Sequence, residues 1–381
     1  MTYKIQLLIK SVTIYWKRYR MFEKLWKKII RRKRFSFLSL LAFILWVASL
    51  LYRVLIKFNR MTQKIEVKTK TPLISIGNIT VGGTGKTPIV AFLAQFLLKE
   101  NYRVGIVSSG YGRKSKENYM LPGYKIVQLD SSQVGDEVKH LAEILPNAIF
   151  SIHQIKATAA VLLDESNSVD IIIVDDGFQH RKLHRDINIV TIDASIKEKE
   201  LKLFPYGLLR EPETKISEAD LIIFTRTELA HELPILIQKI SNYNPNAKQY
   251  FARFSATEII GENQSFPIKY LEDKSVLLFA GIGNFNALKK QVSRLCSDID
   301  FALEFSDHQE YTKELLESIK QTAEKYNSDL ILTTGKDAVK IDNFDFGCDF
   351  YYLNQTIDLD PGEEKLIGYI QNDLKLQKEN S

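Results

Sequence analysis

The sequence predicts an α/β fold in which helices cover both faces of a mostly parallel sheet, followed by a second, smaller α/β domain. Three observations support this prediction. Strand-length apolar segments alternate with helical segments over most of the 381 residues, a pattern typical of parallel sheets. A glycine-rich turn joins the first of these strands to the first helix. Finally, the basic charge is concentrated at the N-terminal end, which we expect to be a separate helical segment.

The first 70 residues form a basic head on an acidic body. They carry 18 Lys and Arg but only Glu23 and Glu66, a net charge of +16, whereas the remaining 311 residues have a net charge of −10. With 45% hydrophobic and 26% charged residues, the composition excludes a disordered or fibrous protein. Cys296 and Cys348 lie far apart without His or Cys neighbours. They exclude a disulfide framework and a zinc site and indicate a reducing compartment.

The basic head is predicted to be membrane-associated. Between Ile5 and Ile30, apolar residues recur in one helical stripe and most basic residues lie opposite, as expected at an anionic lipid interface. Phe35–Tyr52 follows as 18 uncharged residues, at the lower limit for crossing a bilayer. Because basic residues flank this run on both sides, we expect a monotopic or re-entrant anchor. The uncharged run also favours anionic membrane lipids over nucleic acid as the partner.

The body is predicted to contain two domains, residues 71–228 and 247–381. In the first domain, buried strands are predicted at Leu73–Ile76, Val104–Val107, Ile171–Val174, Ile187–Ile192 and Leu221–Phe224. Helices are predicted between them at Pro88–Glu100, Asp136–Leu145 and Lys156–Asp164. A polar segment near Ala230–Asn246 marks the boundary. Strands then resume at Tyr250–Phe254, Val276–Ala280, Leu330–Thr333 and Phe350–Leu353.

The turn between the first strand and the first helix has the pattern of a phosphate-binding loop. It reads Thr80, Val81, Gly82, Gly83, Thr84, Gly85, Lys86 and Thr87, with Thr80 in the place of the usual first glycine. The glycines let backbone N–H groups close around phosphate oxygens, and the helix N-terminus adds further donors. Lys86 is expected to neutralise the β- and γ-phosphates and Thr87 to offer its hydroxyl to Mg²⁺. The first domain is therefore predicted to have a P-loop NTPase-like fold that binds ATP.

Two adjacent acidic residues follow a second apolar strand. Asp175 and Asp176 come directly after Ile171–Val174 and resemble the end of a Walker B strand, whose carboxylate holds the Mg²⁺ of a P-loop enzyme. Carboxylates this close repel each other unless a cation lies nearby. Gln179 and His180 follow, and the residues alone leave open whether they belong to the site or are ordinary loop residues.

Four further polar residues are weaker candidates. Asp136 begins a predicted helix, where capping is the simplest role. Arg210 and Glu211 form either a phosphate-binding arginine with a metal carboxylate or a surface ion pair. His308 follows Ser306-Asp307 and is either a general base, the helper of one, or a structural histidine.

Six motifs occur in order along the chain: Ile76–Pro88, Gly110–Arg113, Val134–Glu137, Asp175–His180, Gly207–Pro212 and Lys336–Val339. Together they resemble the tetraacyldisaccharide 4′-kinase family, the lipid A 4′-kinases, from about residue 35 to the C-terminal region. The sequence departs from the family pattern at Ser109 and Lys156, where Arg is usual, and at Gly335, where an acidic residue is common.

The resemblance implies a membrane-associated enzyme of Gram-negative bacteria. Such an enzyme transfers the γ-phosphate of ATP to the 4′-hydroxyl of a tetraacyldisaccharide 1-phosphate, a lipid A precursor, to give lipid IVA. The resemblance also implies ATP and Mg²⁺ as cofactors and two α/β/α domains joined by a flexible two-stranded link. The body would then lie on the cytoplasmic face of the inner membrane.

The resemblance further implies roles for the motif residues. Asp136 would be the general base, assisted by His308, while Lys86 and Arg210 would stabilise the transferring charge. The residues placed around the metal and the triphosphate would be Thr87, Asp175, Asp176 and Glu211. Those near the acceptor or the nucleotide would be Tyr111, Gln179 and His180.

Two other functions fit parts of the sequence. A membrane-recruited P-loop ATPase of the partitioning or switch type has a similar loop. Its loop, however, usually carries Lys where this chain has Val81, and it lacks the string from Asp176 to His180. A non-enzymatic membrane scaffold with a degenerate nucleotide site is disfavoured by the intact Gly-Lys-Thr and the paired acidic residues.

Overall fold

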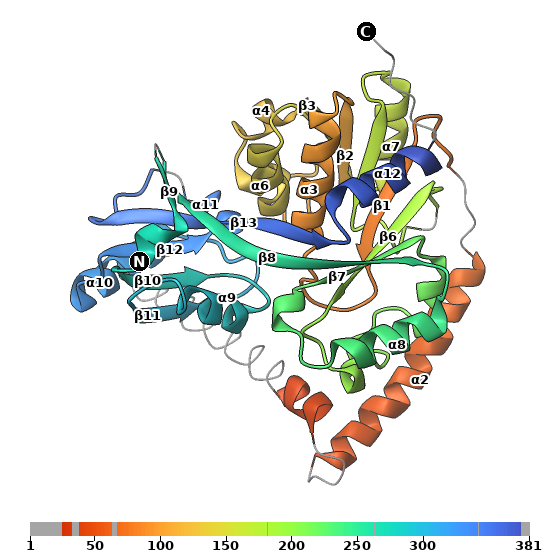
Figure 1. Cartoon of the computed structure of the whole chain (residues 1–381), viewed down its shortest axis with the longest axis horizontal. Helices are drawn as coiled ribbons and strands as arrows, with labels where there is room; N and C mark the ends of the chain where they lie inside the picture. The colour runs from red at the N-terminus through yellow and green to blue at the C-terminus, as the bar shows by residue number, and fades with distance from the viewer. Residues whose placement is uncertain are drawn as a thin grey trace, which may run out of the picture.

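The computed structural model describes residues 25–32, 38–62, 67–180, 182–262, 264–341 and 343–374. Within this part of the chain, one sheet runs through the molecule (Figure 1). Its 13 strands are β1 (Leu73–Asn78), β2 (Val104–Ser108), β3 (Tyr119–Pro122), β4 (Ile149–Ile152), β5 (Ile171–Asp175), β6 (Ile187–Asp193), β7 (Leu221–Thr225), β8 (Lys248–Ile260), β9 (Ser265–Pro267), β10 (Ser275–Ala280), β11 (Asp298–Glu304), β12 (Leu330–Thr334) and β13 (Asp349–Asp360).

The helices lie on both sides of this sheet. The described α-helices with assigned bounds are α2 (Ser39–Thr62), α3 (Lys86–Lys99), α4 (Gly123–Ile126), α5 (Ser131–Val134), α6 (Asp136–Ile144), α7 (Lys156–Glu165), α8 (Leu233–Tyr243), α9 (Phe285–Val292), α10 (Lys313–Tyr326), α11 (Gly335–Ala338) and α12 (Glu363–Asp373). Residues 25–31 are also helical. The predicted α/β class with helices on both faces is confirmed.

The strand order divides the sheet into two mostly parallel halves. The order is β11-β10-β12-β13-β8-β7-β6-β1-β5-β2-β4-β3, with β9 paired to β8. All neighbouring pairs are parallel except β13 with β8, β8 with β9, and β3 with β4. The first half runs from β7 to β3 and the second from β11 to β12. Between them, the long antiparallel pair of β8 and β13 forms a ribbon that is prominent in Figure 1.

The alternation of side chains along each strand explains the layers. In β1, Ile74 and Ile76 pack with α3 and α6, whereas Leu73 points to the opposite face and packs with α7. In β10, Leu278 packs with α9, and Leu277 packs on the other face with α10. Strands buried on both faces are apolar at successive positions, which is why the sequence shows them as continuous apolar runs.

The ribbon joins the two halves physically. The start of β8 pairs with β7, and the start of β13 pairs with β12. The last helix, α12, returns to the first half, where Leu366, Ile367 and Ile370 enter the core of α3 and β1. Because the ribbon and α12 connect both halves, the division into residues 71–228 and 247–381 stays a prediction.

The N-terminal part of the chain packs against the body along one side of α2. Ala42 and Ser49 are buried, and Tyr52 and Ile56 contact the core cluster of β6, β7 and α8. Within the described residues, α2 is the one helix that is long and apolar enough to cross a membrane, over Ser39–Phe58. Most of the predicted amphipathic stretch between residues 5 and 30 lies outside the described residues.

Every predicted strand and helix of the body is present, but the sequence analysis missed several elements. The segment at residues 230–246, interpreted as a polar boundary, contains helix α8, whose Leu236 and Ile240 are buried. The edge strands β3 and β11 were also missed: β3 is only four residues long, and β11 contains three acidic residues and is only partly buried.

Candidate active site

The predicted phosphate-binding loop lies between β1 and α3, as the sequence indicated. Gly85 has a φ of 77° and caps α3, and a Cβ at this position would lie 2.7 Å from the ring of Phe254. Thr80 is buried, pairs with Leu209 in an isolated bridge and lacks a positive φ. A side chain is therefore tolerated where the usual pattern has glycine.

Five side chains gather beside this loop, and we call them the phosphate cluster: Asn78, Lys86, Lys156, Asp176 and Arg210. The Asp176 carboxylate lies 3.4 Å from Lys86 Nζ and 3.3 Å from an Arg210 nitrogen. Arg210 also donates a hydrogen bond to Asn78. Burial opposes the ionisation of Asp176, but the nearby charges of Lys86, Arg210 and Lys156 outweigh it and lower its pKa to about 2. Asp176 is therefore ionised at neutral pH.

Lys156 occupies the interior of this cluster. Its side chain is buried, and Nζ donates hydrogen bonds to the backbone carbonyls of Asp175 at 2.6 Å and Asp176 at 2.9 Å. Desolvation lowers the pKa of Lys156, while both carboxylates oppose the shift. A single nitrogen of Lys156 thus donates to both backbone carbonyls at the end of β5, and the planar, two-pronged geometry of an Arg side chain is not needed for these two bonds.

Asp175 differs from its neighbour. Its carboxylate is buried, and Oδ1 has no hydrogen-bond partner among the described residues. Burial, followed by the negative charge of Glu137, raises the pKa of Asp175 to about 6. A buried carboxylate oxygen without a donor is the expected state of a cation ligand before the cation binds.

The other residues predicted on this side are placed near the same loop. Gln179 donates a hydrogen bond of 2.8 Å to the Asn78 carbonyl. His180 is partly buried, and desolvation together with the Lys156 charge lowers its pKa to about 4. Thr87 is in the first turn of α3 and partly buried, and Glu211 is partly buried next to Arg210.

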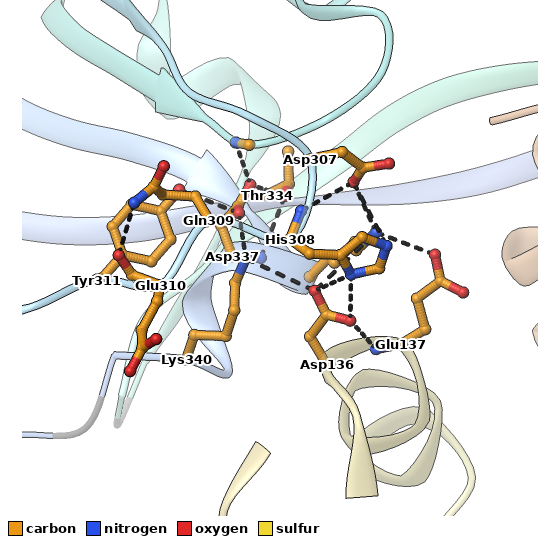
Figure 2. A network of polar contacts seen from close by, with 12 residues as sticks. Asp136, Glu137, Asp307, His308, Gln309, Glu310, Tyr311, Thr334, Asp337 and Lys340 are labelled. Carbon is orange, nitrogen blue, oxygen red and sulfur yellow. Dashed lines mark hydrogen bonds and ion pairs between the residues drawn. The ribbon is translucent and has the colours of Figure 1, made fainter. Parts of the chain in front are cut away.

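A second group of polar residues lies where α6 meets the second half of the sheet (Figure 2). We call it the carboxylate–histidine cluster: Asp136, Glu137, Asp307, His308, Lys336 and Lys340. His308 Nδ1 lies 3.0 Å from each carboxylate oxygen of Asp136, although the two residues are 172 positions apart in sequence. Gly135, with a φ of 95°, begins the turn that places Asp136 in the first turn of α6. The predicted pair is therefore formed.

Two lysines set the charge of Asp136. Lys336 Nζ lies 3.0 Å from Glu137, 2.9 Å from Asp307 and 4.0 Å from Asp136, and Lys340 Nζ lies 3.7 Å from Asp136. Burial opposes ionisation, but the His308 hydrogen bond and the two lysine charges outweigh it, so the pKa of Asp136 is lowered. Asp136 is a carboxylate in the resting site.

A buried carboxylate holds the second half of this cluster in place. Asp337 is fully buried, accepts hydrogen bonds from the Gly281 N–H and from Tyr311 and Thr334, and pairs with Lys340 at 2.8 Å. Asp337 thus ties Lys340 to Thr334 at the end of β12 and to Gly281, which follows β10 (Figure 2). This role was not evident from the sequence, because two of its partners, Gly281 and Tyr311, are distant along the chain.

Tyr111 lies next to the carboxylate–histidine cluster. Its ring packs edge-on against His308 at 5.0 Å between centroids, and 71% of the residue is exposed and available to a ligand.

The departure from the family pattern at Gly335 has a structural reason. At Gly335, a Cβ would lie 2.2 Å from His140 Cε1. The space that a side chain at position 335 would fill is therefore occupied by the His140 ring.

A cleft of about 670 Å³ connects the two clusters. Its lining includes residues 83–88 of the phosphate-binding loop and, from the other cluster, Glu137, Asp307 and Lys336. The negative charge of Glu137, from the carboxylate–histidine cluster, also helps to raise the pKa of Asp175, which lies next to Asp176 of the phosphate cluster. The cleft thus lies between the phosphate-binding loop and the three residues Glu137, Asp307 and Lys336, which belong to the same cluster as the Asp136–His308 pair.

The structure brings most of the predicted residues together, but in two groups. Tyr111 lies with His308, whereas Gln179 and His180 lie by the phosphate cluster. Within the described residues, no group of three or more His, Cys, Asp or Glu side chains is arranged to hold a metal. The predicted metal residues therefore do not form a complete protein-only metal site.

Seven residues of the site had no role predicted from the sequence: Asn78, Glu137, Lys156, Arg226, Asp307, Lys336 and Lys340. Arg226 directly follows β7 and donates a hydrogen bond of 2.8 Å to the Gly83 carbonyl in the phosphate-binding loop. Its position at the carboxyl end of a parallel strand was the available signal, because ligands of such sheets bind at that edge.

Comparisons with known proteins agree with this geometry. The chain matches the model of the family described as tetraacyldisaccharide-1-P 4′-kinase over residues 41–375. It is 35% identical over 272 residues to the tetraacyldisaccharide 4′-kinase of Geobacter metallireducens, covering 71% of this chain and 78% of the relative. It is 33% identical over 324 residues to the enzyme of that name from Aquifex aeolicus, covering 84% and 94%.

A solved structure is similar over nearly the same extent. LpxK from Aquifex aeolicus in complex with ATP superposes with a TM-score of 0.67 at 28% identity, covering 88% of this chain and 99% of that chain. The sequence motifs, the family model and these relatives all indicate the same family. The chain belongs to the tetraacyldisaccharide 4′-kinase family.

Proposed function

We propose that this protein transfers the γ-phosphate of ATP to the 4′-hydroxyl of a tetraacyldisaccharide 1-phosphate, giving lipid IVA. The observation that carries the proposal is the Asp136–His308 contact of 3.0 Å beside a cleft whose opposite side is the phosphate-binding loop. Phosphoryl transfer depends on positioning and charge neutralisation more than on covalent catalysis. The partitioning-type ATPase is not favoured, because the family and the relatives are kinases.

Mg²⁺ fits the residues on the phosphate side. Asp175 offers a buried carboxylate oxygen that has no partner among the described residues, and Thr87 offers a hydroxyl. Mg²⁺ usually takes one or two carboxylates together with substrate phosphates and waters, so a complete protein cage is not required. When bound, the ion would neutralise charge on the β- and γ-phosphates. Asp176 and Glu211 are the remaining metal candidates, and Asp176 already pairs with two cations.

Asp136 is the proposed general base. It is ionised, and His308 fixes its orientation through a hydrogen bond that shares both carboxylate oxygens. As the 4′-hydroxyl attacks the γ-phosphorus, its proton passes to Asp136, and the bond from the γ-phosphorus to the bridging oxygen of ADP breaks. Tyr111, exposed beside His308, is placed to contact the acceptor.

Lys86 and Arg210 are the proposed stabilisers of the transferring charge. In the structure they share the Asp176 carboxylate, which holds both cations at the phosphate-binding loop before a nucleotide arrives. Preorganised cations of this kind stabilise the transition state without reorganisation during the reaction. Gln179 and His180 complete this side of the site, near the nucleotide or the acceptor.

The membrane contact is proposed to involve the outer face of α2. Large apolar side chains there are exposed: Leu40, Leu41, Phe43, Ile44, Trp46, Val47, Leu50, Leu51, Val54, Leu55 and Phe58. The opposite face packs on the body. We therefore infer a monotopic anchor on the cytoplasmic face of the inner membrane. Co-flotation of the full chain with vesicles containing anionic lipid, but much less with neutral vesicles, is the expected result.

A kinase assay tests the proposed function. Purified protein is incubated with γ-labelled ATP, Mg²⁺ and tetraacyldisaccharide 1-phosphate in detergent, with Lys86→Ala in parallel. Labelled lipid formed by the wild type and not by the variant is expected. Hydrolysis of ATP without labelled lipid would contradict the kinase assignment and favour the membrane-recruited ATPase.

A further inference from the structure

One loop lies between the N-terminal segment and the phosphate cluster. This loop, residues 198–213, is called the bridging loop here, and it contains the proposed catalytic Arg210. Its core residues Leu201, Leu203 and Leu209 pack with β6, β7 and α8. The loop is therefore part of the folded body, yet both of its surfaces contact functional parts of the molecule.

The inner surface of the bridging loop is bonded to the segment after β1. The Val81 N–H donates to the Leu208 carbonyl at 2.7 Å, and the Arg210 N–H donates to the Ile79 carbonyl at 2.7 Å. These bonds set the backbone position of Arg210 relative to the phosphate-binding loop. A small displacement of the bridging loop would move the Arg210 side chain away from Asp176.

The outer surface of the same loop is contacted by the N-terminal segment. The Tyr52 hydroxyl donates to the Arg210 carbonyl at 3.1 Å, and the Tyr52 ring packs edge-on against Phe204 at 5.9 Å. Trp26 also packs against Phe204, at 5.7 Å, and donates from its indole nitrogen to the Pro205 carbonyl at 2.7 Å. Arg31 pairs at 2.7 Å with Glu200, whose own side chain is buried.

The backbone of Arg210 makes one hydrogen bond to each of two different parts of the chain. Its N–H is held by the segment after β1, and its carbonyl is held by Tyr52 from α2. Helix α2 presents its apolar face outward and Tyr52 inward. The helix that is proposed to contact the membrane is therefore directly bonded to a residue of the phosphate cluster.

We propose that Tyr52 is a positioning residue for the transfer reaction, holding the Arg210 backbone so that its guanidinium stays at the phosphate cluster. This inference rests on the proposed function and adds a role for the N-terminal segment besides anchoring. Tyr52 acts through Arg210 and need not contact either substrate. Lipid contact at α2 and the geometry of the catalytic arginine are thereby linked through one hydrogen bond.

The test is Tyr52→Phe in the full chain, assayed with detergent-solubilised acceptor so that recruitment to a bilayer does not limit the rate. Loss of one neutral hydrogen bond is expected to lower kcat by about 3- to 10-fold. The KM values for ATP and for the lipid acceptor should stay unchanged. Tyr206→Phe is the matched control, because its hydroxyl is in the same loop and only receives a 3.5 Å contact from Arg32.

A double-mutant cycle separates positioning from general stabilisation. In an Arg210→Ala background, Tyr52→Phe should lower kcat by less than 2-fold, because the group it positions is gone. Multiplicative effects, or a change confined to the KM of the lipid acceptor, would contradict the inference. An inactive wild type would contradict the proposed function itself, whereas an active wild type matched by Tyr52→Phe would overturn only this inference.

Discussion

The phosphate cluster and the carboxylate–histidine cluster differ in how the chain builds them. The first is assembled from the ends of β1 and β5, the first turns of α3 and α7 and the bridging loop, all within the first half of the sheet and next to a continuous motif. The second joins the first turn of α6 to loops of the second half, with Asp136 and His308 separated by 172 positions. One cluster is thus fixed within a half of the protein, and the other exists only where the two halves meet.

This difference indicates a division of labour. In the proposed mechanism the first cluster binds the nucleotide phosphates, whereas the proposed proton acceptor Asp136 is surrounded by His308, Lys336 and Lys340 from the second half. The two halves are linked by the β8–β13 ribbon and by α12. Variants of the two clusters should therefore separate ATP binding from transfer.

Lys86→Ala is expected to have the largest effect. Removing the cation at the phosphate-binding loop should lower the transfer rate by at least about 10³-fold, because charge on the γ-phosphate is no longer neutralised. ATP affinity should fall as well, as measured by calorimetric titration. Lys99→Ala, at the exposed end of the same helix, is the control and should behave as wild type. Near-normal transfer by Lys86→Ala would remove this cluster from the mechanism.

Asp136→Asn should separate transfer from binding. The amide cannot accept the hydroxyl proton, so kcat should fall by about 10²- to 10³-fold, the usual size of a general-base effect. The dissociation constant of ATP should stay within about 2-fold of wild type. Loss of ATP affinity instead would assign Asp136 a structural or metal-binding role.

His308→Gln should have an intermediate effect. Loss of the charge-assisted hydrogen bond to Asp136 is expected to lower kcat by about 10- to 100-fold. The pH profile gives the specific signature. Because His308 helps to lower the pKa of Asp136, its removal should move the acidic limb of the kcat profile to higher pH. An unshifted limb would show that His308 does not tune the base.

Asp175→Asn should raise the thermal stability of the protein, measured without Mg²⁺ and ATP. Burial raises the pKa of Asp175 to about 6. The contribution of protonated Asp175 to the free energy of unfolding is therefore fully present below its unfolded-state pKa near 3.8, and it is lost as the pH rises through 6. The neutral amide avoids this loss, so Tm should be several degrees higher than wild type at pH 7.5. Little difference is expected near pH 4.

Asp176→Asn is the matched control with the opposite sign. The pKa of Asp176 is lowered to about 2, so its stabilisation is present above the unfolded pKa and is lost only as pH falls toward 2. Its amide variant should therefore melt lower than wild type at pH 7.5. Equal Tm changes for the two variants would contradict the different environments of these neighbouring carboxylates.

The same comparison shows what the sequence can and cannot predict. The phosphate-binding loop, the strand before it and the paired carboxylates were predictable, because local spacing determines them. The roles of Lys340 and Asp337 were not predictable. Lys340 contacts Asp136 at the start of α6, and Asp337 accepts hydrogen bonds from Gly281 after β10 and from Tyr311 before α10, all far away along the chain. Likewise, the departure at Gly335 has a physical reason only in three dimensions, where the His140 ring occupies the space.

The carboxylate–histidine pair itself was predicted from a family resemblance and not from spacing. Asp136 and His308 taken alone fit capping and structural roles equally well. Their contact depends on a left-handed conformation at His308, with a φ of 58°, and on the glycine turn before α6. Neither feature has a local sequence signal that identifies its partner.

The central claim is that both clusters act in a single transfer event within one chain. An equimolar mixture of Lys86→Ala and Asp136→Asn proteins tests it most directly, in the labelled-lipid assay used for the wild type. If each chain must supply both clusters to one site, the mixture should form no more labelled lipid than the sum of the two separate variants. Recovery of a substantial part of the wild-type rate would contradict the account, since the two clusters would then be acting separately or in different chains.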